Sequence, residues 1–248
     1  SNLMKVNREY LLLNDNFYIA KNIMRKFDHA IERRAKKEPV AYILGKKEFW
    51  SIDFPINKST LIPRPETELL VREVVKLKEN KNVNILDIGT GCGCILLSIL
   101  KEFHNSKGTG IDICEDAIQV AKKNAKRLNL ANRSLFETKD LNHFCEGEYD
   151  LVVSNPPYVP SAHIKKLSKE ITEYEPLRAL NGGIDGLDLI KKVIYKSKIL
   201  LKKNGILAIE IGYNQYKKVS DILTKNGFRE ASKVCDNGFN VRCIVSTK

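Results

Sequence analysis

The chain has 248 residues, of which 43% are hydrophobic and 29% are charged, and its formal net charge is +12. These proportions are typical of a globular protein and exclude a disordered, collagen-like or coiled-coil chain. No apolar run reaches the roughly 18 residues that a membrane-spanning helix needs, so we expect no association with a membrane. The excess of Lys and Arg permits an acidic partner, and direct binding to nucleic acid stays open on this ground.

The six cysteines lack the spacing of a disulfide framework or of a zinc site. The sequence contains no CxxC pair, and no cysteine stands at ligand-like spacing from one of the four histidines. The first residues contain no long apolar segment of the kind that forms a signal peptide. We therefore expect free thiols, no bound metal and a cytoplasmic location.

The first 77 residues are expected to form a helical segment, then short strands, then a second helix. Apolar side chains at helical spacing predict helix within residues 3–37. Short strands are predicted at residues 42–45 and 49–54. Pro65 is well placed to begin a helix over residues 66–77, because its fixed φ suits the first turn, where no backbone N–H is needed.

From residue 83 onward, predicted strands and helices alternate with short connections. The predicted strands are 83–88, 109–113, 134–138, 151–154, 206–211 and 239–245. The predicted helices are 92–103, 115–128, 186–201, which Asp185 would cap, and 215–226, which Gly227 would close. Such alternation predicts an α/β fold, in which a mostly parallel sheet has helices on both faces and binds ligands at the carboxyl ends of its strands.

A glycine-rich turn, Asp87–Gly93, follows the first strand of this alternation. Glycines let the backbone approach a ligand closely, and amides at the start of a helix attract electron-rich groups. The spacing is G-x-G-x-G, because residue 94 is Cys, and this disfavours binding of a dinucleotide pyrophosphate. Asp112 ends the next strand, where a carboxylate can accept hydrogen bonds from ribose hydroxyls. Together these features predict a nucleoside site, in which Asp87 holds the loop or meets a cationic group of the ligand.

The sequence Asn155-Pro156-Pro157-Tyr158 stands at the carboxyl end of the fourth predicted strand. Its two prolines end the strand and stiffen the turn. The Asn155 side-chain oxygen and the Pro156 carbonyl oxygen can both accept hydrogen bonds from one –NH2 group, and Tyr158 offers an aromatic wall. Such a grip would aim the nitrogen at an electrophilic methyl group by positioning and polarisation, without a general base. The alternative is a purely structural turn in which Asn155 caps its own backbone.

These motifs resemble those of the class I methyltransferases that use S-adenosylmethionine. Within that class the chain is similar to the peptide chain release factor N5-glutamine methyltransferases, the PrmC/HemK family. The discriminating residues lie upstream, in Glu38–Gly45, Glu48-Phe49-Trp50 and the block Leu61–Glu68, and further matches are Glu175-Pro176, Glu210–Gly212 and 236–242. The resemblance runs from about residue 38 to the C-terminus, and it implies a three-layer Rossmann-like methyltransferase fold preceded by a short helical N-terminal segment.

The resemblance divides the chain into three parts. Residues 1–38 would be a partial helical N-terminal domain, shorter than the bundle usual in the family. Residues 39–68 would form a connecting β-hairpin with the block LIPRPETE. Residues 69–248 would form the S-adenosylmethionine-dependent methyltransferase domain.

The same resemblance implies roles for individual residues. The cofactor would be bound by Asp87, Gly89, Thr90, Gly91, Cys92, Gly93, Asp112, Ile113, Asp140, Leu141 and Asn155. Asp112 would hold the ribose, and Asp140 and Leu141 would flank the adenine, although the family often has an aromatic residue where this chain has Leu141. The substrate amide would be received by Asn155, Pro156, Pro157 and Tyr158, of which Asn155, Pro156 and Tyr158 would be catalytic. Arg64, assigned to substrate binding, would brace the site together with Glu66 and Thr67.

The implied reaction transfers a methyl group from S-adenosylmethionine to the side-chain amide nitrogen of the glutamine in the GGQ motif of peptide chain release factors, which would be the protein partners. The alternative is N-methylation of an exocyclic amine of adenine or guanine in DNA or RNA, which the basic charge and the NPPY motif both permit. A binding protein without turnover is a third interpretation, and the presence of both Asp112 and Asn155 argues against it. A nicotinamide dehydrogenase is disfavoured by the glycine spacing and by NPPY.

Overall fold

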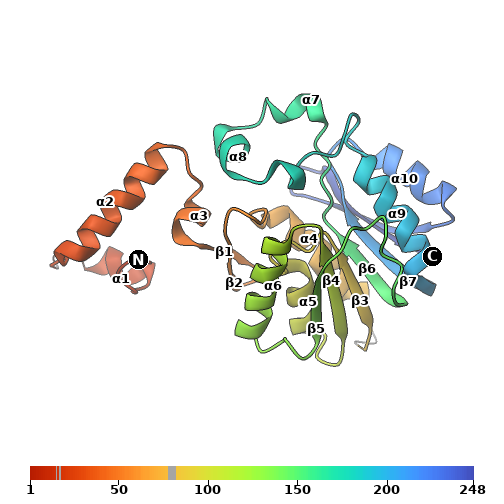
Figure 1. Cartoon of the computed structure of the whole chain (residues 1–248), viewed down its shortest axis with the longest axis horizontal. Coiled ribbons are helices and arrows are strands. Elements are labelled where there is room, and N and C mark those ends of the chain that lie inside the picture. The colour runs from red at the N-terminus through yellow and green to blue at the C-terminus, as the bar shows by residue number, and fades with distance from the viewer. Residues whose placement is uncertain (15, 17, 78–81) are drawn as a thin grey trace.

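A seven-stranded sheet forms the centre of the molecule in the computed structural model, which describes residues 1–14, 16, 18–77 and 82–248 (Figure 1). Its strand order is β5-β4-β3-β6-β7-β9-β8. The pairings from β5 to β7 are parallel, and β9 runs antiparallel to both of its neighbours. The strands are β3 (Asn84–Ile88), β4 (Lys107–Asp112), β5 (Ser134–Thr138), β6 (Tyr149–Ser154), β7 (Leu201–Glu210), β8 (Arg229–Cys235) and β9 (Val241–Thr247).

Helices cover both faces of this sheet. On one face, α4 (Glu68–Leu77), α5 (Cys94–Glu102) and α6 (Glu115–Arg127) contribute to one apolar cluster. On the other face, α9 (Asp188–Leu200) and α10 (Tyr216–Lys225) contribute to a second one. The predicted three-layer α/β fold is therefore confirmed. After β3 the chain adds β4 and β5 on one side of it, and then β6 and β7 on the other side. In open α/β sheets, ligands bind at the carboxyl ends of the strands where the order changes direction in this way.

The predicted strands and helices of the sheet region are present, with ends that shift by a few residues. The structure also contains one strand, β8, that was not predicted from the sequence. The segment 229–235, REASKVC, mixes charged and small residues and lacks the apolar alternation of a half-buried strand. It lies at the edge of the sheet, where only one side needs a partner. Asp185 is not the residue at the helix boundary either, because α9 begins at Asp188 and Asp185 accepts a hydrogen bond from the Leu187 amide.

The strand predicted at residues 42–45 is wrong. Val40–Leu44 forms the short helix α3, which follows Pro39 and ends at Gly45 with a left-handed φ of 72°. The apolar run resembled a strand, but Pro39 before the helix and Gly45 after it favour a single helical turn. A hairpin follows, made of β1 (Lys46–Phe49) and β2 (Ile52–Pro55).

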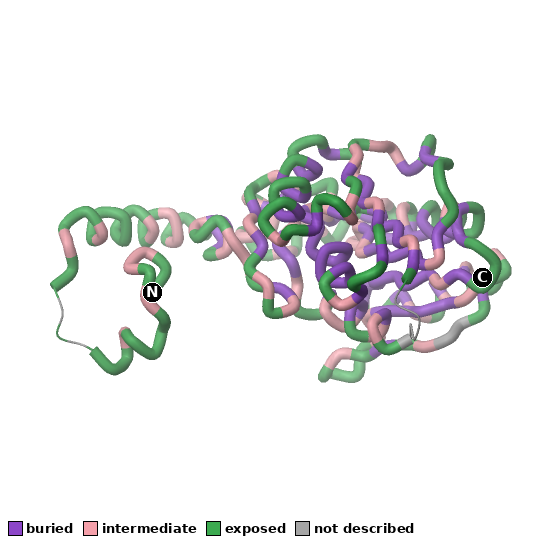
Figure 2. Tube along the Cα trace, turned by 90° about the horizontal axis from the view of Figure 1, so that it is seen from below, coloured by how far each residue is buried: buried purple, intermediate pink, exposed green. Residues whose placement is uncertain are grey.

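The N-terminal segment consists of separate helices, α1 (Arg8–Leu13) and α2 (Lys21–Ala35). Neither helix has a buried residue, and the segment projects from the body as an exposed arm (Figure 2). Its end is attached to α8 (Lys169–Tyr174), because Arg34 forms an ion pair of 2.6 Å with Glu170, and the Tyr174 hydroxyl donates to the Lys36 carbonyl. The arm therefore contacts the segment that follows the NPPY motif.

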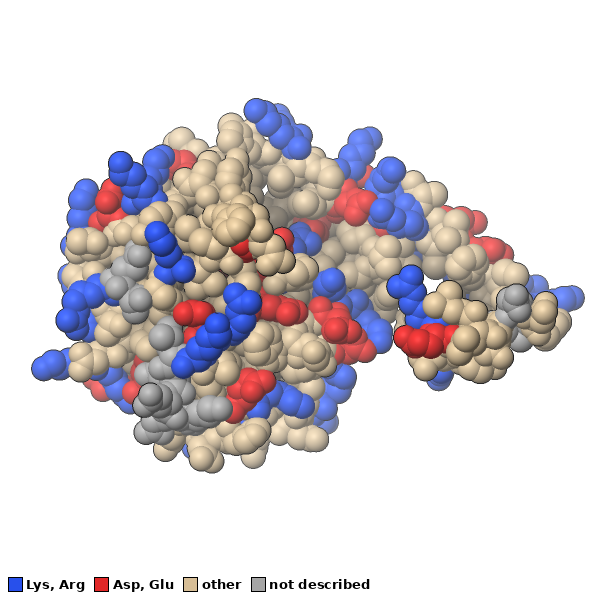
Figure 3. Space-filling view, turned by 180° about the vertical axis from the view of Figure 1, so that it is seen from behind, with Lys and Arg blue, Asp and Glu red and all other residues tan. Residues whose placement is uncertain are grey.

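Lys and Arg side chains are spread over the face shown in Figure 3 and are interrupted by Asp and Glu.

The cysteines Cys92, Cys94, Cys114, Cys145, Cys235 and Cys243 all carry free thiols. Within the described residues, no helix is both long enough and apolar enough to cross a membrane.

The packing of α5 on the sheet can be tested with Leu96, which is fully buried and contacts β4 at Gly108. We expect Leu96→Ala to lower the free energy of unfolding by about 2–5 kcal/mol, because it removes buried methyl groups and leaves a cavity. Leu135→Ala is the control, since Leu135 is 54% exposed on β5. Urea denaturation measures both variants, and equal losses would contradict the assigned core.

Candidate active site

The glycine loop runs from the end of β3 into α5 in a conformation that requires glycine. Gly89, Gly91 and Gly93 have φ values of 74°, 54° and 81°, in the left-handed region that other residues rarely adopt. The amides of Gly89 and Thr90 both donate to the Ile111 carbonyl at the end of β4, at 2.9 and 3.0 Å. A Cβ atom at Gly89 or Gly91 would meet no other atom within 4 Å, so the loop borders open space on its outer side.

Asp112 holds this loop to the end of β4. One of its carboxylate oxygens accepts from the Gly91 amide at 3.0 Å, and the other accepts from the Cys114 amide at 2.9 Å. The carboxylate is thereby fixed beside the glycine loop. A carboxylate oxygen can accept more than one hydrogen bond, so both oxygens keep the capacity to bind ligand hydroxyls.

A large cavity opens at the carboxyl ends of β3 and β4. Of the predicted cofactor residues, those that line it are Gly89, Gly91, Asp112, Ile113, Asp140, Leu141 and Asn155. The other predicted residues, Asp87, Thr90, Cys92 and Gly93, are not among its lining residues. The structure therefore brings together the end of β4, the glycine loop and the start of the loop after β5.

Asp87 lies beneath the loop and is completely buried. It accepts a hydrogen bond of 2.6 Å from the Thr90 hydroxyl, and burial raises the pKa of its carboxyl to about 7. This buried position indicates that Asp87 holds the glycine loop and does not contact a ligand.

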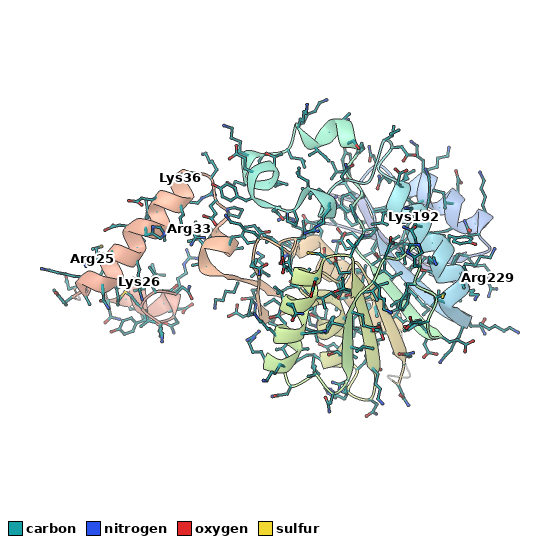
Figure 4. All side chains as sticks on the ribbon, viewed as in Figure 1. Arg25, Lys26, Arg33, Lys36, Lys192 and Arg229 are labelled. Carbon is teal, nitrogen blue, oxygen red and sulfur yellow. The ribbon has the colours of Figure 1, made fainter. Side chains whose placement is uncertain are left out.

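The far end of the large cavity is formed by the turn after β5. Asp140 accepts from the Asn142 backbone and side chain at 2.8 and 2.9 Å, and these hydrogen bonds lower its pKa. Leu141 adds an apolar surface to the wall. Three further lining residues were not predicted from the sequence. They are Leu189 and Lys192 on α9, the latter labelled in Figure 4, and Arg178 in the short helix η2 (Leu177–Ala179).

A small pocket lies next to the large cavity and is bordered by the NPPY residues. Asn155, Pro156, Pro157 and Tyr158 line it, together with Leu61 and Arg64 from the upstream block. The two cavities share a wall formed by Leu61, Asn155, Pro157 and Ala179. A group held in the small pocket therefore lies next to a ligand in the large one, with Asn155 at the junction.

The Asn155 carboxamide has a defined orientation. Its nitrogen donates to the Thr67 hydroxyl oxygen at 3.1 Å, so its oxygen is left for another donor. Neither this oxygen nor the Pro156 carbonyl oxygen accepts a hydrogen bond from any residue that the structure describes. The two acceptors that the sequence analysis assigned to an –NH2 group are thus both unused. The structural alternative, in which Asn155 caps its own turn, is not what the contacts show.

Behind Asn155 lies a buried hydrogen-bond network centred on Glu210, at the end of β7. The Thr67 hydroxyl donates to one Glu210 oxygen at 2.6 Å, and the Tyr158 hydroxyl donates to the other at 3.2 Å. Thr67 and Glu210 are each 2% exposed. Burial raises the pKa of the Glu210 carboxyl to about 7, although both hydrogen bonds act to lower it. The network therefore holds the side chains of Asn155 and Tyr158 in place at the small pocket.

Arg64 borders the small pocket and is tied to Glu175, which follows α8. The guanidinium lies 2.5 Å from one Glu175 oxygen, and the other oxygen accepts from the Ile62 amide at 3.2 Å. The Glu175 side chain is only 1% exposed. Arg64 therefore braces the block Leu61–Glu68, of which η1 (Pro65–Thr67) is part, against the segment after NPPY.

A glycine-rich segment supports the NPPY turn from outside, and the sequence analysis missed it. Val159 forms a bridge with Asn181, and the Gly182 amide donates to the Val159 carbonyl at 2.9 Å. A Cβ atom at Gly182 would lie 2.8 Å from the Pro157 carbonyl oxygen, so only glycine fits there. The buried Gln215 side chain donates to the Tyr158 carbonyl at 3.1 Å. The described residues contain no cluster of three or more His, Cys, Asp or Glu side chains that could hold a metal ion.

Comparison with known proteins agrees with this geometry. Residues 79–241 match a protein-family profile described as "Methyltransferase domain", and residues 1–45 match one described as "PrmC N-terminal domain". A methyltransferase structure from Pyrococcus furiosus has a TM-score of 0.60 and 19% identity, covering 90% of this chain and 99% of that one. This likeness shows the fold.

Similar sequences carry a more specific name. The chain is 39% identical over 238 residues to the release factor glutamine methyltransferase of Rhodospirillum rubrum, covering 96% of this chain and 73% of that protein. The protein of the same name from Clostridium acetobutylicum is 41% identical over 232 residues, covering 92% and 81% respectively.

The bracing role of Arg64 leads to a stability test. We expect Arg64→Met to lower the free energy of unfolding by about 2–4 kcal/mol, because it leaves the buried Glu175 carboxylate without its cation. The double variant Arg64→Met/Glu175→Gln should recover much of this loss, since the unpaired charge is then gone. Urea denaturation of the two single variants and the double variant gives the coupling energy. Strictly additive losses would show that the pair does not act as a unit.

Proposed function

We propose, since this chain belongs to the family of release factor glutamine methyltransferases, that it transfers a methyl group from S-adenosylmethionine to the amide nitrogen of the glutamine in the GGQ motif of a peptide chain release factor. The observation that carries the proposal is the pair of unused acceptors, the Asn155 side-chain oxygen and the Pro156 carbonyl oxygen, beside the cavity that Gly89, Gly91 and Asp112 line.

The residues of the large cavity fit S-adenosylmethionine. Asp112 provides carboxylate oxygens for the ribose hydroxyls, and Gly89 and Gly91 leave space for close approach of the methionine part. Ile113 and Leu141 provide apolar surface for the adenine, and Leu189 adds to it from α9. Leu141 cannot stack as an aromatic residue would, so the adenine is held by aliphatic packing. The other loop residues do not line the cavity and would affect cofactor binding only by maintaining the conformation of the loop; they are Asp87, Thr90, Cys92 and Gly93.

The chain's own residues bind and orient the amide. S-adenosylmethionine, when bound, supplies an electrophilic methyl group on a positively charged sulfur. Asn155 and Pro156 each accept one hydrogen bond from the glutamine –NH2, which fixes the plane of the amide and increases the electron density on its nitrogen. Tyr158 and Leu61 border the same pocket. As the carbon–nitrogen bond forms and the carbon–sulfur bond breaks, the nitrogen becomes strongly acidic, and it then loses one proton to solvent without a general base.

The protein substrate is favoured over a nucleic acid base. The alternative, N-methylation of adenine or guanine, rests on NPPY and on net charge, whereas relatives about 40% identical over most of the chain are named for release factors. Direct contact with nucleic acid and a cytoplasmic location remain predictions. We keep the division into residues 1–38, 39–68 and 69–248, in which the first part and the catalytic domain meet through Arg34 and Glu170.

The reaction is tested with recombinant release factor and S-adenosylmethionine, followed by mass spectrometry of the GGQ peptide. We expect one added methyl group on the glutamine, and none on DNA or RNA offered in the same assay. Absence of the methyl group from the glutamine, with cofactor bound, would defeat the proposal.

Asn155→Ala should lower kcat by about a hundredfold or more, because the amide loses one of its two acceptors and its fixed orientation. Binding of S-adenosylhomocysteine, measured by calorimetry, should change much less. Asn237→Ala is the matched control, since Asn237 is exposed in the turn between β8 and β9. Full activity of Asn155→Ala would refute the role given to this residue.

Asp112→Asn should weaken binding of S-adenosylhomocysteine about tenfold to a hundredfold, because hydrogen bonds to a charged group contribute roughly 1.5–3 kcal/mol. Isothermal titration calorimetry measures the dissociation constant. The matched control is Asp221→Asn, on the exposed side of α10. Equal affinities for the two variants would show that the ribose is bound elsewhere.

A further inference from the structure

We propose that the negative charge of Glu210 decides which way the Asn155 carboxamide faces, so that this buried carboxylate is a positioning residue for the substrate amide. The inference rests on the proposed function, because it concerns the pocket assigned to the glutamine side chain. It adds a requirement that the NPPY motif alone does not contain, since Glu210 is 55 residues further along the chain (210 − 155).

The direction of each hydrogen bond follows from counting donors. An ionised Glu210 can only accept, so the hydroxyls of Thr67 and Tyr158 must both donate to it, at 2.6 and 3.2 Å. The Thr67 oxygen has then used its only hydrogen and faces Asn155 as an acceptor. The group of Asn155 that meets it, at 3.1 Å, must be the nitrogen. The Asn155 oxygen consequently faces the small pocket, which is the orientation that receives an –NH2 group.

Protonation of Glu210 removes this constraint. A neutral carboxyl donates its own hydrogen, and its contact with Thr67 then allows the Thr67 hydroxyl to donate to Asn155 instead. The Asn155 carboxamide would then rotate, so that its oxygen accepts from Thr67 and its nitrogen faces the pocket. Two –NH2 groups facing each other cannot form a hydrogen bond, so the substrate amide would lose one of its two acceptors.

The surroundings of Glu210 place this change near neutral pH. Burial is the main cause that raises its pKa to about 7, and Glu66 on η1 acts in the same direction. Hydrogen bonds from Thr67 and Tyr158 lower the pKa, as does the charge of Arg242 on β9. The thiol of Cys243, also on β9, stays neutral, because burial raises its own pKa well above the usual range. Across the network from Glu210, burial likewise raises the pKa of the Tyr158 hydroxyl, which therefore remains a donor.

The first test is the pH profile of kcat at saturating cofactor and release factor. We expect kcat of the wild-type chain to rise with pH through about 7 and to fall about tenfold per pH unit below that midpoint, because the ionised form is the active one. Glu210→Gln should lower kcat and remove the pH dependence, with KM and the affinity for S-adenosylhomocysteine little changed. Glu148→Gln, at an exposed position, is the control and should keep the wild-type profile.

A second pair of variants separates the hydroxyl from general packing. Thr67→Val keeps the shape of the side chain but removes the hydroxyl, and it should lower kcat about tenfold to a hundredfold through misplacement of Asn155. Thr67→Ser retains the hydroxyl and should restore most of the activity. A merely structural role for Thr67 would instead make both variants alike, and that result would overturn the proposal.

The third measurement needs no turnover. In protein labelled with ¹⁵N at asparagine, the side-chain resonances of Asn155, assigned by their loss in Asn155→Ala, should shift with a midpoint near pH 7 in the wild type and stay constant in Glu210→Gln. Resonances that do not move with pH would refute the positioning role even if the glutamine is methylated. A wild-type chain that does not methylate glutamine would refute the proposed function, whereas the asparagine resonances would still decide the role of Glu210.

Discussion

The hydrogen bonds that converge on the buried carboxylate of Glu210 join three distant parts of the chain into one site. Thr67 comes from the block between the hairpin and α4, Tyr158 from the turn after β6, and Glu210 from the end of β7. Because the carboxylate is shielded from water, each of these hydrogen bonds is stronger and its loss more costly than at the surface. The turn that bears Asn155 is consequently held from behind, and its two acceptors can point outward without a partner of their own.

The large cavity, to which we assign the cofactor, depends on a different element of the fold. There the end of β4 holds the glycine loop through Asp112 and the Ile111 carbonyl, whereas Asp87 stabilises the same loop from below. The two halves meet at Asn155, which borders both cavities. This separation explains how a carboxylate at a strand end can serve two purposes, since Asp112 faces a cavity and Glu210 is sealed in the interior.

The parts of the site that could be predicted are those that follow directly from a strand end. The glycine loop, Asp112 and the NPPY turn each come immediately after a strand, and the alternation of strands and helices places all strand ends of a parallel sheet at one edge. The helix α3 was missed because five apolar or small residues are equally compatible with a strand, and its flanking Pro39 and Gly45 decide the outcome. The upstream block was connected to the site only by family resemblance.

The contacts that could not be predicted join residues far apart in sequence through the backbone or through burial. Glu175 binds Arg64 across 111 positions, and nothing in the local pattern of either residue indicates its partner. Gly182 lies against the backbone of the NPPY turn, a close approach that depends on where a loop returns in space. For the same reason the sequence named Glu210 only as a family match, with no role, since burial of its carboxylate arises from the assembled sheet.

Under the proposed function, the paired acceptors of the small pocket would also determine how many methyl groups are transferred. A primary amide offers two hydrogens and can satisfy both the Asn155 and Pro156 oxygens, whereas the same nitrogen after one transfer has a single hydrogen and a methyl group. The modified side chain can then engage only one acceptor, and its methyl group would lie against the other oxygen. Under the proposed function, the pocket would therefore bind its product less well than its substrate, and the reaction would stop after the first methyl group.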